Sequence, residues 1–93
     1  MPGVVRLGDI SRGHGCWGAR PNTSASADTF ANTKGVHRVD DSWATHCCVS
    51  CHGGVAVQGS PNVFANGRAV VRQGDAISCG DHAEECSPDV IIN

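Results

Sequence analysis

The apolar positions of this chain form short runs that are separated by tight turns. Residues 59–79, GSPNVFANGRAVVRQGDAISC, show the pattern most clearly, because apolar residues at 63–64 and 69–71 flank the dipeptide Asn66-Gly67. Both central residues of a type I′ turn need a positive φ, and Asn-Gly is the usual pair there. The stretch therefore predicts a β-hairpin, followed by a Gly-Asp turn and by Cys79, a candidate metal ligand.

Shorter apolar runs predict further strands in the rest of the chain. Residues 3–9 predict a short strand that ends in a Gly-Asp turn, and residues 29–39 predict two β-runs around a polar turn. Residues 87–93 predict a last strand. The segments between these runs predict three loops, at residues 11–28, 42–54 and 76–86. No stretch has the 3.6-residue period of an amphipathic helix, so we expect an all-β fold.

Two motifs of the hairpin segment occur three times each along the chain. The first motif reads SADTFAN at 26–32, SPNVFAN at 60–66 and SPDVIIN at 87–93. The second reads RLGD at 6–9, RVDD at 38–41 and RQGD at 72–75. The chain begins and ends in the middle of a repeat, which indicates a single domain over residues 1–93 made of three hairpin units in circular order.

Repeats of this size form units that cannot bury their apolar faces alone, so they stack or arrange themselves around an axis. We expect a pseudo-three-fold axis that relates the three hairpins. Such an axis would place Phe30, Phe64 and Ile91 in equivalent positions, facing one another.

Composition indicates a domain that needs stabilisation beyond its apolar core. The 93 residues include two Trp, two Phe, one Met and no Tyr, whereas Gly occurs twelve times. A small chain with so little bulk generally needs a disulfide, a metal or a partner. Six Cys and five His make a metal the first candidate and disulfides the second.

Charge and hydropathy exclude several classes of function and suggest a compartment. The net charge of −2 with mixed signs argues against nucleic-acid binding. No stretch approaches the roughly 20 apolar residues of a membrane helix, and the N-terminus lacks the apolar core of a signal peptide. We therefore expect synthesis in the cytoplasm, where Cys/His clusters bind metal more often than they form disulfides. Any export would use a route that does not read a signal peptide.

A candidate ligand follows each Gly-Asp or Asp-Asp turn at a nearly constant distance. His14 and His46 lie five residues after the aspartate that ends such a turn, and Cys79 lies four residues after it. His52, at the end of the middle loop, is the natural fourth ligand. Three imidazoles and one thiolate suit Zn²⁺, which prefers four N/S ligands in a tetrahedron. The closed set predicts a structural zinc, because it leaves no coordination position for water.

The remaining spacings leave a more cysteine-rich site open as an alternative. Cys48-x-x-Cys51 and Cys79-x-x-His82 both have metal-ligand spacing, and together they could build a site without His14.

The other cysteines and histidines have simpler interpretations. Cys16, Cys47 and Cys86 are interpreted as small buried or half-buried residues. His37 lies within a strand run and is expected to face solvent. His82 is expected to be a solvated loop residue.

The repeated units resemble the PAAR-repeat family over nearly the whole chain. The resemblance rests on SPNVFANGRAVVRQGD, the flanking RLGD and the closing SPDVIIN. The Pro-Ala-Ala-Arg motif corresponds to residues 68–72, RAVVR, and is only partly present. Two departures fall in the first hairpin, which reads SADTFANTKG and has Asp40 where Gly is usual. The resemblance implies a conical all-β domain with a zinc near its narrow tip, held by His14, His46, His52 and Cys79.

The resemblance also implies a function. Members of the family cap a trimeric β-helical spike in type VI secretion systems and contractile phage tails. We therefore expect a structural spike-tip protein without enzymatic activity, which binds one VgrG-like or phage spike homotrimer through a base around Phe30, Phe64 and Ile91. Such a trimer ends in three exposed strand edges, which a pseudo-three-fold domain can match.

The same role implies further partners and a destination. It predicts transient membrane contact when the spike is fired, effector proteins as additional partners, and delivery outward on the spike or within a virion tail. A zinc-delivery or redox module that uses the CCVSC cluster is the alternative function.

Overall fold

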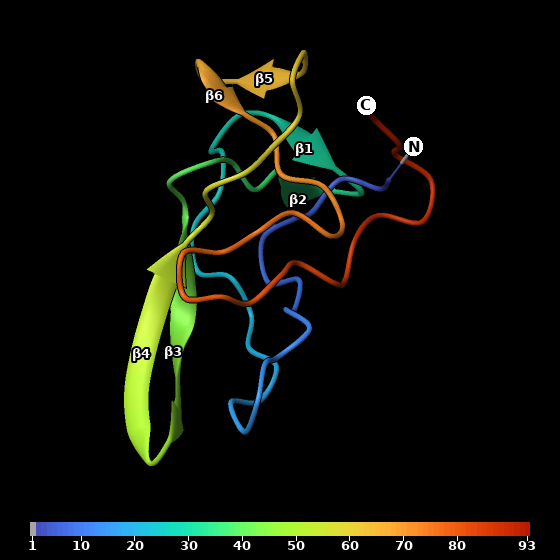
Figure 1. The fold of residues 1–93 in the computed structure, drawn as a ribbon. Helices are drawn as coiled ribbons and strands as arrows, with labels where there is room; N and C mark the ends of the chain where they lie inside the picture. Colours follow the sequence, from blue (N-terminus) through green and yellow to red (C-terminus); the bar gives the residue numbers. More distant parts are fainter. Residues whose placement is uncertain (1) are drawn as a thin grey trace.

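The computed structural model describes residues 2–93, and this part of the chain contains strands and turns but no helix. Three separate antiparallel sheets of two strands each make up the regular structure (Figure 1). They pair β1 (Phe30–Ala31) with β2 (Lys34–Gly35), β3 (Ser42–Cys48) with β4 (Ser50–Val55), and β5 (Phe64–Ala65) with β6 (Arg68–Ala69). The all-β prediction is confirmed.

The hairpins β1–β2 and β5–β6 have the same register and the same turn. Phe30 pairs with Gly35, and Phe64 pairs with Ala69. In both turns the two central residues have a positive φ, of 53° and 68° in the first hairpin and of 55° and 76° in the second. These signs belong to a type I′ turn. The first hairpin therefore keeps the turn geometry although its sequence reads NTKG where the β5–β6 hairpin has NGRA, and Thr33 lies in the left-handed region.

The third unit is assembled from the two ends of the chain. Gly3 forms an antiparallel bridge with Ile91, and the Ile92 N–H donates to the Pro2 carbonyl over 3.1 Å. The two ends consequently lie side by side (Figure 1). The strands predicted at 3–9 and 87–93 are wrong as continuous strands. Gly3, Val4 and Arg6 form isolated bridges to three different segments, and in 87–93 the one bridging residue is Ile91.

A closed ring of backbone hydrogen bonds joins the three units at their centre. The N–H of Val5 donates to Val71, that of Val71 donates to His37, and that of His37 donates to Val5, over 2.9–3.0 Å. All three residues are almost fully buried. The ring has the connectivity expected around a pseudo-three-fold axis.

His37 is buried, so the expectation that it faces solvent is wrong. It occupies the central position that valine occupies in the other two units, and its ring packs edge-on against Trp43 at 5.0 Å. Its Nδ1 lies 2.8 Å from the Ser24 carbonyl. Burial lowers the pKa of His37 to about 4, which keeps the ring neutral inside the fold.

The RxxD motif closes an equivalent turn in each unit. In every case the aspartate accepts hydrogen bonds from both the guanidinium and the backbone N–H of the arginine three residues earlier, over 2.8–3.0 Å. The pairs are Arg6–Asp9, Arg38–Asp41 and Arg72–Asp75. The carboxylates are buried, and a buried carboxylate must be paired in this way.

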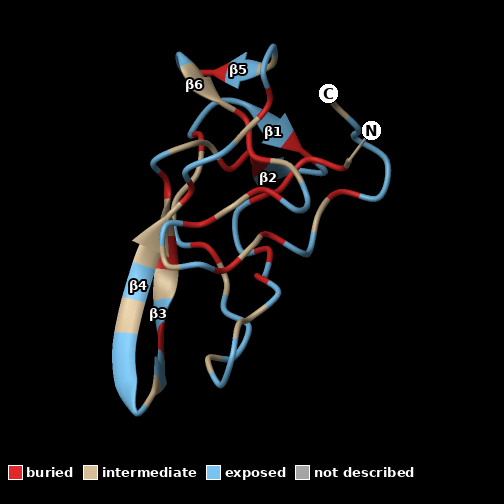
Figure 2. Cartoon of the chain, viewed as in Figure 1, coloured by how far each residue is buried: buried red, intermediate tan, exposed pale blue. Residues whose placement is uncertain are grey.

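The core consists of two small apolar clusters. Figure 2 shows buried positions in red through the body of the molecule, whereas the far end of β4 is exposed. One cluster contains Val5, Trp43, Ala56, Val71, Ile77 and Ala83, and the other contains Val4, Ala31, Val36, Ala65 and Val70.

Phe30, Phe64 and Ile91 occupy equivalent positions in the three units, and all three are exposed rather than buried in the core. Their exposed fractions are 60%, 59% and 44%, respectively. Successive side chains of a strand point to opposite faces. The next residues along the chain, Ala31, Ala65 and Ile92, are therefore the ones that reach the second core cluster. The three predicted residues therefore form an exposed apolar set at this end of the molecule, defined here as the base.

The hairpin β3–β4 extends from the body away from β1–β2 and β5–β6 (Figure 1), within a molecule whose principal extents are 37 × 23 × 21 Å. The prediction of a loop at residues 42–54 is wrong, because this segment forms the longest strand pair among residues 2–93. The register of the β3–β4 pair shifts between Trp43 and His46, and pairing then continues to a turn at Val49, whose φ is 65°. We define this turn and the adjacent loop at 13–17 as the tip.

Candidate metal centre

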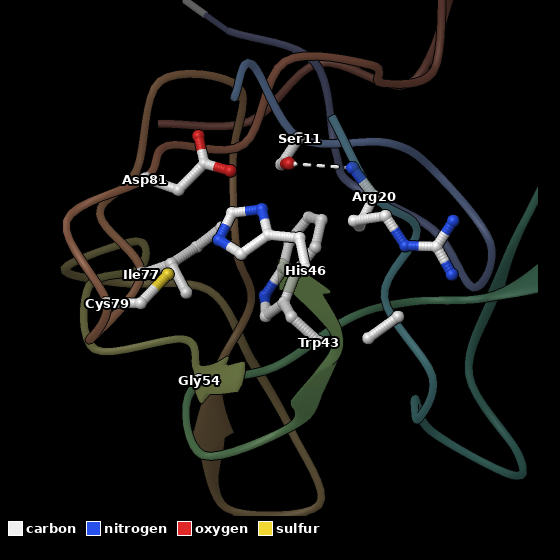
Figure 3. Close-up of a pocket in the computed structure, with 9 residues that line it drawn as sticks. Ser11, Arg20, Trp43, His46, Gly54, Ile77, Cys79 and Asp81 are labelled. Atoms are coloured by element: carbon white, nitrogen blue, oxygen red, sulfur yellow. Dashed lines mark hydrogen bonds between the residues drawn. The ribbon is translucent and has the colours of Figure 1, made fainter. Parts of the chain in front are cut away.

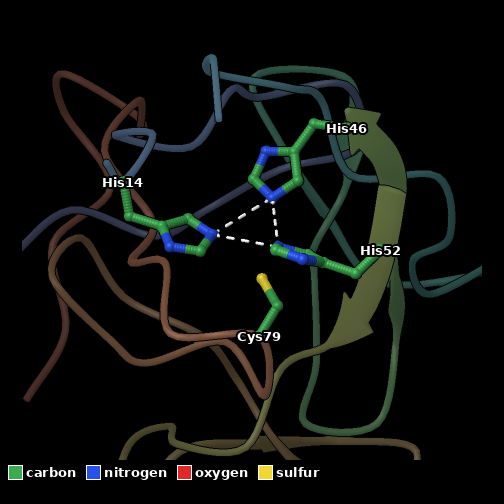
Figure 4. A group of neighbouring side chains, drawn as sticks. All are labelled: His14, His46, His52 and Cys79. Atoms are coloured by element: carbon green, nitrogen blue, oxygen red, sulfur yellow. Dashed lines mark hydrogen bonds between the residues drawn. The ribbon is translucent and has the colours of Figure 1, made fainter. Parts of the chain in front are cut away.

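Three imidazoles and one thiol converge just behind the tip (Figure 4). The three Nε2 atoms lie 3.2 Å apart for His14 and His46, 3.1 Å for His14 and His52, and 2.8 Å for His46 and His52. Together with the Cys79 sulfur, all four donor atoms lie within 4.8 Å of one another. The four residues proposed from the sequence are thus the ones that the fold brings together.

The spacing of the nitrogens fits a tetrahedral metal ion. With metal–nitrogen bonds of about 2.0–2.1 Å, two ligands of a tetrahedron lie about 3.3–3.4 Å apart. Three imidazole nitrogens at 2.8–3.2 Å are close to that value, and without an ion or proton between them their lone pairs would oppose one another. The donor set fits a structural Zn²⁺ better than Mg²⁺ or Ca²⁺, which prefer oxygen.

Two ligands are positioned by one strand pair. His46 on β3 lies directly opposite His52 on β4, so their side chains share one face of the hairpin. The Nδ1 of His46 lies 2.8 Å from the Gly18 carbonyl, which can only accept, so Nδ1 carries the proton. The lone pair of His46 is therefore on Nε2, aimed at the other ligands, and Gly18 acts as the outer partner that fixes the ring.

The neutral form of His52, which metal binding requires, is also favoured. Desolvation and then the nearby His46 and His14 rings lower the pKa of His52. A histidine must be deprotonated to coordinate, so this direction supports binding.

Cys79 is delivered by a loop that docks on the end of β4. Ile77 bridges Ala56, and the Ser78 N–H donates to the Val55 carbonyl over 2.9 Å. A Cβ at Gly54 would lie 2.9 Å from Ser78 Oγ and 3.0 Å from Ile77 Cγ2, so a larger residue would push this loop outward. The absence of a side chain at position 54 lets Cys79 approach the imidazoles.

Trp17 covers the imidazoles from outside. Its ring stacks on His14 with centroids 5.1 Å apart and lies 4.8 Å from the His52 ring. Its indole N–H donates to the Ser50 carbonyl over 3.0 Å, which attaches the His14 loop to the hairpin. No motif assigns a role to Trp17; the signal was a lone tryptophan three residues after a ligand in a Gly-rich loop.

A small hollow separates the metal group from the core (Figure 3). His46 and Cys79 form part of its wall, and the rest comes from apolar side chains such as Trp43 and from polar ones such as Arg20. The hollow has no room for a sizeable substrate, in keeping with a site that holds an ion.

Four of the six cysteines form disulfides, which corrects two expectations. Cys16 pairs with Cys48 and Cys47 pairs with Cys51, so these thiols are not reduced in the structure. The residues at 16 and 47 are exposed, not buried or half-buried as expected. The spacing of cysteines in a sequence cannot give their connectivity, which is why the pairing was not predicted.

The disulfides also argue against the cysteine-rich ligand set. Cys48 and Cys51 are both cross-linked and have no free thiolate. Only Cys79 and Cys86 are free, and Cys86 is half-buried as expected. Burial raises the pKa of the Cys86 thiol. His82 is partly buried and lies outside the group of converging donors.

Comparison with known proteins identifies one family. The family model of the PAAR motif matches residues 12–84 of the 93-residue chain. A search of curated proteins found no significant match. Within residues 2–93 there is no helix long and apolar enough to cross a membrane. The matched segment includes all four converging donors and most of the three units, and the chain belongs to the PAAR-motif family.

Proposed function

We propose that this protein is a structural tip that caps the trimeric β-helical spike of a contractile injection machine. The observation that carries the proposal is the arrangement of two opposite ends: four donors that could hold a metal lie just behind the tip, and three equivalent exposed apolar residues lie at the base. The PAAR family is associated with the tips of type VI and contractile spikes, which supports this assignment.

The base supports docking to a homotrimer, one tip per trimer. Phe30, Phe64 and Ile91 are related by the pseudo-three-fold arrangement, and all three are exposed. Exposed large apolar side chains that gather on one surface are typical of an interaction site. Each could contact one identical chain of a VgrG-like or phage central spike.

The tip supports a role in which Zn²⁺ is structural. His14, His46, His52 and Cys79 would hold the ion, which would supply a cross-link between the first loop, the β3–β4 hairpin and the third loop. Binding of a structural zinc contributes on the order of 10 kcal/mol to folding. The chain's own part is to exclude water with Trp17 and to fix the His46 tautomer through Gly18.

In this proposal the protein transmits force and performs no chemistry. It would be made in the cytoplasm and carried outward on the spike or within a virion tail, with transient membrane contact as the tip passes. Effector proteins are further partners that such a tip could carry.

Binding of base variants to a trimeric spike fragment from the same genome tests the docking. Replacing Phe30 or Phe64 by Glu should weaken binding by about five-fold or more, since loss of an apolar anchor at an interface centre costs over about 1 kcal/mol. Val49→Glu is the matched control, because Val49 is fully exposed at the opposite end. Equal binding by all three variants would contradict the assignment of the base, and no binding by the wild-type chain would contradict the function.

A zinc-delivery module is the competing function, and exchange of the metal distinguishes the two. His46 is buried and Trp17 covers the other imidazoles, which favours a retained ion. Loss of zinc to a mild chelator within seconds, without unfolding, would favour delivery instead.

A further inference from the structure

Each cross-linked cysteine lies within two residues of a candidate metal ligand in the sequence. Cys47 directly follows His46, and Cys51 directly precedes His52. The other disulfide has a similar relation, since its two cysteines each lie two residues after a histidine ligand, at positions 14 and 46.

Each disulfide consequently connects two segments that carry imidazoles. Cys16–Cys48 ties the His14 loop to β3, across 32 residues of sequence. Cys47–Cys51 ties β3 to β4 at the rung next to the His46–His52 pair. Together the two bonds hold the three imidazole-bearing segments to one another, and the Cys79 loop is the one ligand segment left without a cross-link.

The four sulfurs do not form a metal site of their own. Cys47 and Cys48 are consecutive on β3, so their side chains point to opposite faces of the hairpin. Within residues 2–93, the one group of His, Cys, Asp and Glu that could hold a metal contains none of these four cysteines. Their effect on the metal centre is therefore exerted through the backbone.

We propose that the two disulfides form a redox lock on the metal centre. When the disulfides are oxidised they fix the positions of the three imidazoles, and when they are reduced only the metal ion holds the imidazoles together. This inference rests on the proposed zinc site. In a reducing cytoplasm the four cysteines are thiols, and an oxidising exterior favours the disulfides. The lock closes when the tip passes from the first environment to the second.

The chemistry of closing is thiol–disulfide exchange with an oxidised small thiol such as glutathione disulfide. For each cross-link two Cys S–H bonds break and one S–S bond forms; the two protons and two electrons convert one external disulfide to two thiols. Cys16, Cys47 and Cys51 are exposed, so an external reagent can reach both pairs.

The lock has two consequences for the ion. In the oxidised chain the imidazoles stay assembled without metal, so zinc binds to a preorganised site and leaves slowly. In the reduced chain the end of the β3–β4 hairpin can separate, and the His14 loop is no longer tied to β3. Zinc exchange should therefore depend on the redox state even though no disulfide sulfur touches the ion.

The test measures release of zinc from the full chain to a chromogenic chelator, before and after reduction with a phosphine that is a poor zinc ligand. Mass spectrometry maps the disulfides in each sample. We expect release to be about ten-fold faster or more after reduction, because the cross-links no longer restrain the ligand segments. The double variants Cys16→Ser/Cys48→Ser and Cys47→Ser/Cys51→Ser should each release zinc faster than the oxidised wild type.

Cys86→Ser is the matched control, since Cys86 is a free thiol away from the ligands and its variant should behave as the wild type in both states. Equal release rates from the oxidised and reduced wild-type chain would overturn the lock, as would failure of glutathione disulfide to form these two bonds or failure of the chain to bind zinc. The wild-type comparison decides the matter even where a double variant does not fold.

Spike binding separates this inference from the proposed function. The base lies at the opposite end, so oxidised and reduced chains should bind the spike fragment equally. Loss of spike binding in both states would contradict the proposed function and would leave a redox-dependent release rate as evidence for the lock.

Discussion

At the scale of single residues, His37 shows how the three-fold repeat accommodates an exception. It stands where the other two units place valine, and its Nε2 has no hydrogen-bond partner among residues 2–93. A neutral imidazole with one bonded nitrogen can be buried, whereas an imidazolium there would lose most of its hydration. His37 therefore lowers the free energy of unfolding in acid, independently of any protonation of the metal ligands.

The pH dependence of stability tests the burial of His37. The pKa of His37 is lowered from 6.5 to about 4 in the folded chain. Between these two pH values the unfolded chain therefore binds a proton that the folded chain does not bind. The free energy of unfolding should fall as the pH drops from 6.5 towards 4, by about 3 kcal/mol at most. Urea unfolding at pH 7 and pH 5 measures this change.

His37→Val is the control for that measurement, because it removes the titrating group and keeps the zinc ligands. The contribution of the ligand histidines is common to both chains and cancels in the comparison. Parallel pH profiles for the wild type and the variant would show that His37 does not resist protonation.

Ligand variants test the metal centre residue by residue. Cys79→Ala and His46→Ala should each lower the melting temperature and the zinc content together, since a lost ligand weakens a site whose binding energy is folding energy. X-ray absorption at the zinc edge of the wild-type chain should give three nitrogens at about 2.0 Å and one sulfur at about 2.3 Å. Two or more sulfurs, or unchanged zinc content in both variants, would reject this ligand set.

At the scale of elements, the turns and the strands differ in how far the sequence specifies them. Asn-Gly predicted the β5–β6 hairpin, because few dipeptides suit two positive φ values. The β3–β4 hairpin was missed because WATHCCVSCHGG has neither regular alternation nor a turn dipeptide, and its register shifts between Trp43 and His46. The final strand was overpredicted, since SPDVIIN has apolar residues but only one bridging partner there.

The ligands were easier to predict than the strands around them. A nearly constant distance from the RxxD turns identified His14, His46 and Cys79, because those turns are held rigidly by buried ion pairs. Trp17 and the Gly18 carbonyl could not be predicted, since their roles depend on how the first loop folds over the hairpin.

Removal of a buried turn carboxylate should destabilise the fold. Asp41 accepts hydrogen bonds from the side chains of Arg38, Arg68 and Ser24 and from the Arg38 N–H. We expect Asp41→Asn to lower the free energy of unfolding by about 3 kcal/mol, because it leaves Arg38 partly buried and without its counter-charge.

Glu84→Gln provides the comparison for Asp41→Asn in the same urea-unfolding experiment. Glu84 pairs with Arg12 on the surface, where both side chains are about half exposed, and loss of such a pair costs less than about 1 kcal/mol. Equal effects of the two substitutions would contradict the structural importance of the buried turn.

At the scale of the whole molecule, the unit formed by the two chain ends makes the order of the units interchangeable. The Gly3–Ile91 bridge takes the place of the strand pairs in the other two hairpins. The contacts that hold the base together therefore do not require the two chain termini to lie in this unit rather than in one of the other two.

A circular permutant tests that interchangeability. Joining the two ends through a short Gly linker and opening the chain between Asn66 and Gly67 should preserve the fold and one bound zinc, as judged by circular dichroism and metal analysis. Opening the chain at Val49 instead breaks the turn between His46 and His52, so with the Cys47–Cys51 bond reduced this permutant should lose the zinc. A reduced Val49 permutant that retains zinc, or an Asn66 permutant that does not fold, would contradict the account of the units.

The most direct test of the central claim is native mass spectrometry of the chain mixed with its trimeric spike fragment at micromolar concentration. A metal-stabilised tip with internal three-fold symmetry predicts a complex of three spike chains, one copy of this chain and one zinc ion. Three copies of the chain per trimer, or separate species with no complex, would contradict it.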